Sequence, residues 1–267
     1  MHIIAISNRK GGTGKTTVSV NLAAELAALG WRVLLIDLDS QGHCAVGLGL
    51  KTERTKASVH RLFLDPAATL SEAVEQTAVE NLWLAPADEF FDHGSGVRND
   101  RRLSNAIRDE KFADRFDLII IDTPPSLDAL LVSGLMAATR VLIPYVPHYL
   151  SYQGVRQLVR LLFKIMTHDN RTLKILGFLP TMAADHIRQH RSVTGEMSHQ
   201  FGAHRVLPGV RNDIRLAEAF AAGQPVRLYA PKTRGAQDFA QLAGHLVEAL
   251  KEQREGSVPS AFSRAID

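Results

Sequence analysis

The stretch SNRKGGTGKTT, which spans residues 7–17, carries residue types that bind phosphate groups in proteins. Lys15 offers a cation to the β and γ phosphates of a nucleotide, and the Thr16 hydroxyl is a suitable Mg²⁺ ligand at the start of a helix. Glycines let the backbone turn tightly and point its N–H groups at phosphate oxygens. These glycines are Gly11, Gly12 and Gly14. The stretch therefore predicts a loop that binds a nucleoside triphosphate together with Mg²⁺.

The beginning of this stretch departs from the strict pattern G-x-x-x-x-G-K-[ST]. Arg9 stands where that pattern has its first glycine, and a second lysine, Lys10, follows directly. The cation that such a loop needs for its own nucleotide is already present in Lys15. The residues of the loop by themselves leave the purpose of Lys10 open.

Carboxylates follow two of the predicted buried strands. The segment LIIIDTPP places Asp122 at the end of one strand, and VLLIDLDSQG places Asp37 and Asp39 at the end of another. The carboxyl ends of parallel strands border the nucleotide crevice of an open α/β sheet. We therefore expect these aspartates to surround the phosphate loop, with Asp122 holding the Mg²⁺ shell through water.

Short runs rich in Ile, Val and Leu alternate with longer segments of helical character, and several of the runs are apolar throughout. Such runs are typical of parallel strands that are covered on both faces. Strands are predicted at residues 2–7, 32–37, 81–86, 116–122, 140–146, 173–180 and 204–210. Helices are predicted at residues 15–29, 98–113, 127–138, 152–167, 186–201, 213–222 and 235–254. The order indicates an α/β fold with a single doubly wound, mainly parallel sheet flanked by helices.

The chain shows no internal repeat and no Gly/Ser/Pro-rich linker, so residues 1–254 are predicted to form a single domain. Loops and short helices are expected at 51–76. Residues 255–267 contain a proline and few large apolar residues, and we expect a flexible C-terminal tail there.

Composition limits the classes of protein that fit. The single cysteine, Cys44, excludes an internal disulfide framework and a cluster held by several thiolates of one chain. The sequence contains neither a leader-like segment nor an apolar run of about 18 residues, so a cytoplasmic protein is expected. Residues 1–150 carry 15 Lys+Arg and 18 Asp+Glu, a balance of −3, and residues 151–267 carry 16 and 10, a balance of +6. A basic C-terminal half can hold nucleic acid or anionic lipid through phosphates.

The motifs KGGTGKTT, LLIDLDSQG and IIIDTPP, in this order and spacing, resemble those of the deviant Walker A ATPases of the ParA/MinD group, which have the P-loop NTPase fold. The segments VRNDIRLAEAFAAGQPV and YAPKTRGAQDFAQLAGHL resemble the ParA branch, the partition ATPases that include the Soj-like chromosomal proteins. The resemblance extends from residue 2 to about residue 250.

The resemblance implies a role for the second lysine. In this family the extra lysine, which matches Lys10, crosses an ATP-sandwich homodimer and contacts the phosphates held by the partner subunit. A cation supplied in trans makes phosphoryl transfer depend on assembly. Asp39 would orient or activate the attacking water, so the residues implied in catalysis are Lys10, Lys15 and Asp39.

The same resemblance implies ATP and Mg²⁺ as the cofactors. Thr16, Asp37 and Asp122 would hold the metal, and Thr17 would contact the α phosphate. The full set of implied cofactor-binding residues is Lys10, Gly11, Gly12, Thr13, Gly14, Lys15, Thr16, Thr17, Asp37 and Asp122.

Two positions depart from the family pattern. Ser40 stands where many relatives have proline, and the turn is expected to form with either residue. Pro208 lies three residues before Arg211, whereas many relatives place a proline directly before the corresponding segment. Candidates for adenine contacts are Met182, Pro208 and Arg211.

The ParA branch implies binding to double-stranded DNA without sequence preference, through basic residues gathered on one face of the dimer. The candidates are Arg188, Arg191, Arg211 and Arg215, with Lys232 and Arg234 as weaker ones. A cargo-linked adaptor would stimulate ATP hydrolysis, and the protein would associate with the nucleoid. The cargo itself, whether a plasmid, a chromosome, a chemoreceptor cluster or a protein organelle, is left open.

Two alternatives remain beside this prediction. A MinD-like positioning ATPase would attach to a membrane through an amphipathic C-terminal helix, but Pro259 interrupts the segment KEQREGSVPSAFSRAID and no basic amphipathic face forms there, so no membrane partner is expected. A regulatory or scaffold protein that binds nucleotide with little turnover is the other alternative. His186 and His190 are four residues apart on a predicted helix, and a surface position is expected for them rather than a metal site.

Overall fold

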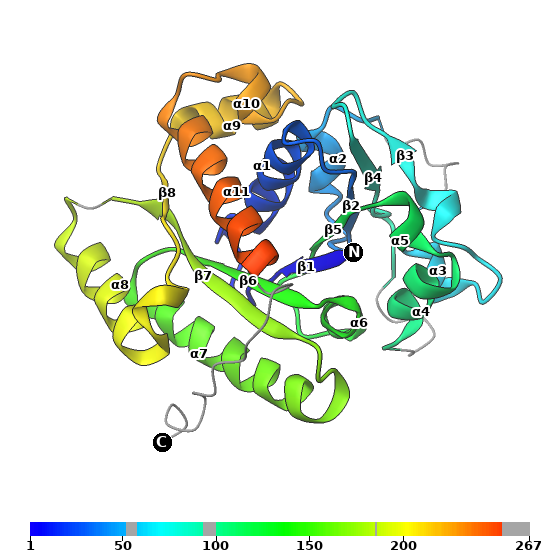
Figure 1. The fold of residues 1–267 in the computed structure, drawn as a ribbon, viewed down its shortest axis with the longest axis horizontal. Helices are drawn as coiled ribbons and strands as arrows, with labels where there is room; N and C mark the ends of the chain where they lie inside the picture. The colour runs from blue at the N-terminus through cyan, green and yellow to red at the C-terminus, as the bar shows by residue number, and fades with distance from the viewer. Residues whose placement is uncertain (52–57, 93–99, 185, 253–267) are drawn as a thin grey trace.

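A sheet of eight strands forms the centre of the computed structural model, which describes residues 1–51, 58–92, 100–184 and 186–252 (Figure 1). The strand order is β3-β4-β2-β5-β1-β6-β7-β8, and neighbouring strands are parallel except for β3 and β4. The strands are β1 (His2–Ile6), β2 (Val33–Asp37), β3 (Glu75–Gln76), β4 (Leu82–Ala85), β5 (Leu118–Asp122), β6 (Arg140–Tyr145), β7 (Lys174–Ala183) and β8 (Val210–Arg211).

Helices cover both faces of this sheet. They are α1 (Lys15–Ala28), α2 (His43–Gly47), α3 (Arg61–Leu64), α4 (Arg102–Asp109), α5 (Phe112–Arg115), α6 (Ala129–Ala137), α7 (Tyr149–Lys164), α8 (Arg188–Phe201), α9 (Ile214–Ala221), α10 (Val226–Tyr229) and α11 (Arg234–Glu252). Figure 1 shows α1 and α11 packed together with α9 and α10 beside them, whereas α7 and α8 run along the other side. Within the described residues, no helix is long and apolar enough to cross a bilayer.

The core consists of two apolar clusters separated by the sheet. Successive side chains of a strand point to opposite faces, so on β5 Leu118 and Ile120 belong to the cluster with α1 and α11. Ile119 and Ile121 belong to the cluster with α6 and α7. This two-sided burial explains why the central strands are apolar throughout, and it confirms the predicted doubly wound, mainly parallel α/β fold.

The last predicted strand is wrong for most of its length. Residues 203–205 form a 3₁₀ turn, η3 (Ala203–Arg205), Val206 makes one isolated bridge to Phe178, and only Val210–Arg211 pairs as β8. Pro208 has no N–H group to offer to a ladder, which interrupts pairing between the bridge and β8. Strand β3 was not predicted, because two residues are too few to show a period.

Helix boundaries also differ in two places. The predicted helix at 98–113 is divided into α4 and α5, because Lys111 adopts a left-handed backbone with φ of 53°. Helix α7 begins three residues earlier than predicted, since the His148 side chain caps its first turn. It continues through a π-helical turn, η2 (Ile165–Asp169), and another 3₁₀ turn, η1 (Ser71–Ala73), lies within 51–76. The predicted tail at 255–267 lies outside the described residues.

Candidate nucleotide-binding site

The loop that joins β1 to α1 has the backbone conformation that its glycines allow. Gly12 and Gly14 have φ of 71° and 78°, in the left-handed region that residues with a side chain rarely adopt. The Thr181 hydroxyl of β7 donates to the Thr13 carbonyl at 2.9 Å, and the Thr13 hydroxyl donates to the Lys10 carbonyl at 3.3 Å. The loop is therefore held in shape by the protein itself.

Lys15 is the first residue of α1 and is buried. Burial lowers the pKa of its ammonium group, while the nearby carboxylates of Asp122 and Asp39 act in the opposite direction. The lysine thus stands at the amino end of a long helix among anionic groups. A phosphate group brought to this position would meet both a cation and the positive end of the helix dipole.

Asp37 and Asp122 are register partners at the carboxyl ends of β2 and β5, and both are fully buried. Asp122 accepts hydrogen bonds from the Thr16 hydroxyl at 2.7 Å and from the Ser19 hydroxyl at 2.9 Å. The Cys44 thiol donates to the same carboxylate at 3.5 Å. Asp37 accepts from the backbone N–H groups of Asp39 and Cys44, each at 3.0 Å.

These two carboxylates are electrostatically unfavourable as they stand. Burial, followed by the charge of Asp122, raises the pKa of Asp37 well above its ordinary value. Burial also raises the pKa of Asp122, although the Thr16 hydroxyl and Lys15 oppose the shift. A divalent cation nearby would favour the charged form of both groups.

The donor atoms around this pair fit Mg²⁺. Hard cations take oxygen ligands, and Thr16, Asp37 and Asp122 supply a hydroxyl and two carboxylates. Sulfur is present too, because the Cys44 side chain lies within reach of both carboxylates. Burial and the two aspartates raise the pKa of the Cys44 thiol well above its ordinary value, which favours the protonated thiol that donates to Asp122 in the ligand-free chain.

Asp39 lies just beyond β2 and lines a cavity of about 610 Å³ together with Lys15, Thr16 and Thr17. The turn that carries it closes through the Gly42 N–H, which donates to the Asp39 carbonyl at 2.9 Å. Ser40 lies within this turn, so the turn forms without the proline found in many relatives. Unlike Asp37, Asp39 is only half-buried.

The cavity is completed by residues from β7, β8 and α9. Met182 and Arg211 line it, whereas Pro208 is not among the described residues that do so. Met182 has a φ of 51°, which is uncommon for a residue with a side chain and is often found at ligand sites. Of the three adenine candidates, Met182 and Arg211 therefore have the right location for a ligand contact.

Lys10 lies apart from this cavity. Among the described residues, those that line the cavity include Lys15 but not Lys10. The Lys10 ammonium nitrogen lies 3.4 Å from Nε2 of His148, at the N-terminus of α7. The two lysines of the loop thus have different surroundings, and only Lys15 faces the pocket of its own chain.

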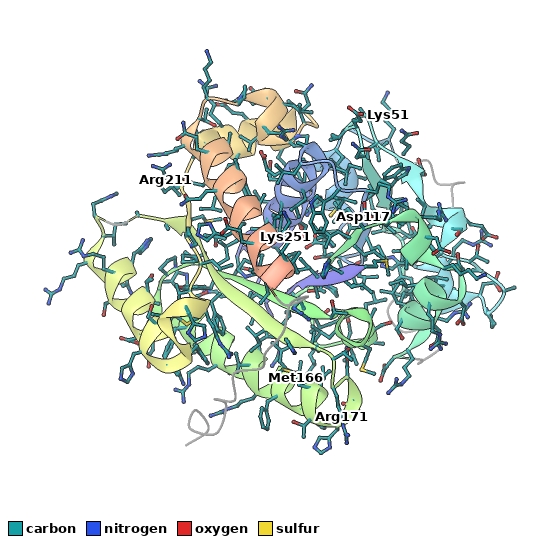
Figure 2. The ribbon with its side chains drawn as sticks, in the orientation of Figure 1. Lys51, Asp117, Met166, Arg171, Arg211 and Lys251 are labelled. Carbon is teal, nitrogen blue, oxygen red and sulfur yellow. The ribbon has the colours of Figure 1, made fainter. Side chains whose placement is uncertain are left out.

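The predicted DNA-contacting arginines are distributed over two regions. Arg188 and Arg191 are exposed on α8, and Arg215 is exposed on α9, where it pairs with Glu218. Arg211 extends from β8 beside α11, as Figure 2 shows, and binds the buried carboxylate of Asp238 at 2.8 Å. The Arg211 pair anchors β8 to α11, and DNA contact by any of these arginines stays a prediction.

The two histidines near α8 differ in their surroundings. His186 is exposed, and His190 accepts a hydrogen bond from the Ala184 N–H at 3.2 Å through Nδ1. Neither belongs to the cluster of metal-ligating side chains found among the described residues, which is Asp37, Cys44 and Asp122.

A glycine-rich loop before a helix, a buried lysine and paired strand-end carboxylates define the class of P-loop nucleotide-binding proteins. Comparison with known proteins narrows the class. Residues 1–175 match the family model described as "AAA domain". Soj of Bacillus subtilis, a sporulation initiation inhibitor protein, is 36% identical over 246 residues, which cover 90% of this chain and 96% of Soj. The chromosome partitioning protein ParA of Caulobacter vibrioides is 31% identical over 259 residues, covering 95% and 97%.

A solved structure agrees with these relatives. A Mycobacterium smegmatis protein described as cobyrinic acid a,c-diamide synthase, with a bound ATP analogue and magnesium, has a TM-score of 0.79 and 30% identity. The match covers 95% of this chain and 97% of that one. This chain therefore belongs to the ParA/Soj family of ATPases, as its motifs indicated. The ligands of the solved relative are of the kind expected from the sequence.

Sequence reasoning missed several residues that the structure brings to the site. Ser19 and Cys44 both donate to Asp122, Thr181 anchors the loop, and His148 lies against Lys10. A signal was available for three of them. His148 follows the predicted strand at 140–146 and Thr181 follows the one at 173–180, so both lie near the carboxyl edge of the sheet. The position of Ser19, one helical turn after Thr16, also places it on the same face of α1.

Proposed function

We propose that this protein is an ATPase that dimerises with ATP, binds nucleoid DNA without sequence preference, and positions or segregates a cargo. The main support for this proposal is that the two lysines of one loop lie in different places. Lys15 lines the nucleotide cavity of its own chain, whereas Lys10 lies outside it. A lysine outside the cavity is suited to a nucleotide held by another subunit.

In this proposal the loop and Lys15 hold the phosphates of ATP, and Thr17 contacts the α phosphate. Thr16, Asp37 and Asp122 hold Mg²⁺, whose charge is partly neutralised by the two carboxylates. When bound, Mg²⁺ would polarise the phosphates and stabilise the charge that develops in phosphoryl transfer. The buried oxygens fit this metal because like charges at Asp37 and Asp122 are unfavourable without it.

Asp39 orients the water that attacks the terminal phosphate. It is the strand-end aspartate that lines the cavity; its backbone N–H donates to Asp37, and one oxygen of its carboxylate accepts from the Gln41 N–H at 3.2 Å. Its half-buried position leaves a side-chain oxygen within the space that a nucleotide and a water would share. Asp37, by contrast, is committed to two backbone N–H groups.

ATP joins two copies because Lys10 of each contacts the phosphates of the other. Hydrolysis then dissolves the dimer, since the loss of the terminal phosphate removes the group that both copies hold. This coupling makes ATP the signal for assembly and hydrolysis the signal for release. A cargo-linked adaptor would increase the rate of hydrolysis.

The dimer binds DNA through Arg188, Arg191, Arg211 and Arg215. The basic balance of residues 151–267 supports this, as does the exposure of the arginines on α8 and α9. Binding through phosphates alone is independent of base sequence and decreases steeply with salt. Nucleoid association follows from such binding, and it agrees with the name of the relative described as a chromosome partitioning protein.

The proposal is tested by measuring mass and DNA binding with each nucleotide. With Mg²⁺ and a non-hydrolysable ATP analogue, light scattering should report a dimer, and with ADP a monomer. Lys10→Ala should bind the analogue and stay monomeric. Only the dimer should retain random duplex DNA, with log affinity decreasing against log salt by about 0.9 for each phosphate neutralised.

Three results would contradict parts of this function. A wild-type chain that remains monomeric with the analogue would exclude the dimerisation step. A dimer that shows no salt-sensitive retention of random duplex DNA would exclude nucleoid binding. Hydrolysis that no candidate adaptor accelerates, in a chain that still binds ATP, would favour the regulatory or scaffold alternative.

A further inference from the structure

His148 caps helix α7 and thereby fixes its own tautomer. Its Nδ1 accepts a hydrogen bond from the Ser151 N–H at 3.2 Å, in the arrangement of an N-cap side chain. A neutral imidazole has one acceptor nitrogen and one N–H donor. Because Nδ1 is the acceptor, the proton of the neutral ring belongs on Nε2.

Nε2 of His148 faces the Lys10 ammonium nitrogen at 3.4 Å. An ammonium group has only donors, so two donors face each other across this gap. The gap also lies at the N-terminus of a 16-residue helix, where a cation is disfavoured and an anion is favoured. Lysine, imidazole N–H and helix dipole all present positive charge to the same point, and no side chain among the described residues acts as an acceptor between Lys10 and His148.

No nearby group supplies that acceptor among the described residues whose charges act on His148. Those charges come from Lys10 in the phosphate loop and His190 on α8, and both lower the pKa of the imidazole after burial, the largest cause. His190 itself accepts at Nδ1 from the Ala184 N–H, so its Nε2 also carries the proton when neutral. The described side chains whose charges act on His148 are therefore positive, and the contact that opposes them is a backbone hydrogen bond at His148 itself, which raises the pKa of the imidazole.

We propose that the Nε2–H group of His148 is a second donor, beside Lys10, to a phosphate oxygen of the ATP bound in a second copy of this chain. This inference rests on the proposed function, because it assigns a new residue to the contact that Lys10 makes in trans. His148 is thus a phosphate-binding residue of the dimer that does not contact the nucleotide of its own chain.

A second copy is the source that the surface around His148 favours. Tyr149 and Leu150, which directly follow His148, are 57% and 66% exposed, although both are large and apolar. A free phosphate ion would leave them in water, whereas a second copy that brings its nucleotide to Lys10 would cover them. The Lys10 side chain also runs along α7, with its Cβ 3.9 Å from where a side chain at Gly154 would begin.

The proposal predicts proton uptake on dimerisation. An anion against the ring favours the imidazolium, so the pKa of His148 rises from its lowered value in the free chain. Dimer affinity should then increase as pH decreases from 8 to 6. ATP and other groups also titrate in this range, so the informative quantity is the difference between wild-type and variant profiles.

The test compares dimer affinity in sedimentation experiments at pH 6, 7 and 8, with Mg²⁺ and a non-hydrolysable ATP analogue. His148→Asn keeps a side-chain oxygen that can cap α7 and removes the titratable ring. We expect dimerisation at least about tenfold weaker, the effect of losing a hydrogen bond to a charged group, and a flatter pH profile. His148→Asp also caps the helix, but its carboxylate attracts Lys10 of the same chain, so a larger loss is expected.

A surface histidine serves as the matched control. His245→Asn on α11 alters an exposed histidine, so its dimer affinity and pH profile should equal those of the wild type. Melting temperatures of all variants without nucleotide should agree within a few degrees, which separates a change of binding from a change of folding.

Three outcomes would overturn the inference or its basis. A His148→Asn protein with wild-type affinity at every pH would show that His148 binds no phosphate, while ATP-dependent dimerisation would stand. Inorganic phosphate that alone shifts the His148 ring resonances of the monomer, as much as the analogue does in the dimer, would show that the site takes a free anion. A wild-type chain that never dimerises would instead refute the proposed function.

Discussion

Strand β5 carries an aspartate at each end, and the two have opposite electrostatics. Asp117 precedes the strand and accepts the Arg32 guanidinium at 2.8 Å, with both side chains more than two-fifths exposed. The Arg32 contacts hold the pKa of Asp117 at about 2, below its ordinary value of 3.8. Asp122 ends the strand, is fully buried beside Asp37, and has its pKa raised by burial.

The comparison distinguishes a structural ion pair at Asp117 from a ligand site at Asp122. At the amino edge of the sheet, an aspartate is paired with a cation from the same chain and faces water. At the carboxyl edge, the charge of Asp122 disfavours the ionised form of Asp37. The nearby cation, Lys15, also belongs to the nucleotide site. Substitutions at the carboxyl edge are therefore expected to change ligand binding and ligand-dependent stability strongly, and substitutions at the amino edge only weakly.

The largest expected effect is that of Lys15→Gln on nucleotide affinity. Removing the buried cation leaves the phosphates without their charge partner, and binding of Mg-ATP should weaken at least about 100-fold. Calorimetry with the ATP analogue would measure it. Lys10→Gln is the matched control, since it removes a lysine of the same loop that lies outside the cavity, and its affinity in the monomer should be unchanged. Equal losses in both variants would contradict the separate roles of the lysines.

The next effect concerns turnover. Asp39→Ala removes the group that orients the attacking water, and we expect the rate of phosphate release to decrease about 10²–10⁴-fold. The buried pair Asp37 and Asp122 is left intact, so ATP binding and dimerisation should persist. Phosphate release and light scattering on the same sample would check both points. Normal hydrolysis by this variant would remove the assignment of Asp39.

A smaller effect is expected on melting temperature, and its sign should differ with and without Mg-ATP. Asp122→Asn removes a buried charge beside Asp37, and the Thr16 and Ser19 hydroxyls can reorient to satisfy the amide. Because the folded-state pKa of Asp122 is raised, the ligand-free wild type loses stability as pH rises from 3.8 through that pKa. The variant should therefore gain about 2–4 °C in melting temperature near pH 8, the shift that about 1 kcal/mol produces at nearly this size.

Mg-ATP should reverse this order, because only the wild type keeps both carboxylates for the metal. Melting curves at pH 5 and pH 8, with and without Mg²⁺ and the analogue, would test the reversal. A variant that is less stable than the wild type without ligand at pH 8 would show that the buried pair is not unfavourable.

The smallest effect is expected at the amino edge. Arg32→Ala breaks the exposed pair with Asp117, and such pairs contribute little, so the melting temperature at pH 7 should decrease by about 2 °C or less. Since the pKa of Asp117 is depressed to about 2 in the folded chain, this contribution is present above pH 3.8 and disappears as pH decreases toward 2. A decrease at pH 7 as large as that caused by a core substitution would contradict the comparison.

Local patterns predicted the central strands and the tight turn of the glycine-rich loop, because each depends on neighbouring residues. Apolar runs identified β1, β2, β5 and β6. Strand-end position was enough to bring Asp37 and Asp122 together, since parallel strands end at one edge. The failures were of another kind. Strand β8 is only two residues long. Its Arg211 side chain binds Asp238 on α11, which is 27 residues away along the chain.

The amino-acid sequence by itself determined the family, the fold class and the residues of the loop, because glycine spacing and buried-strand runs are local properties. Only the tertiary structure decided which groups share a proton or a charge. It placed Cys44 and Ser19 on Asp122, committed Arg211 to Asp238, and set His148 against Lys10 across 138 residues of chain. Electrostatic interactions depend on distance and burial, and neither is written in the order of residues.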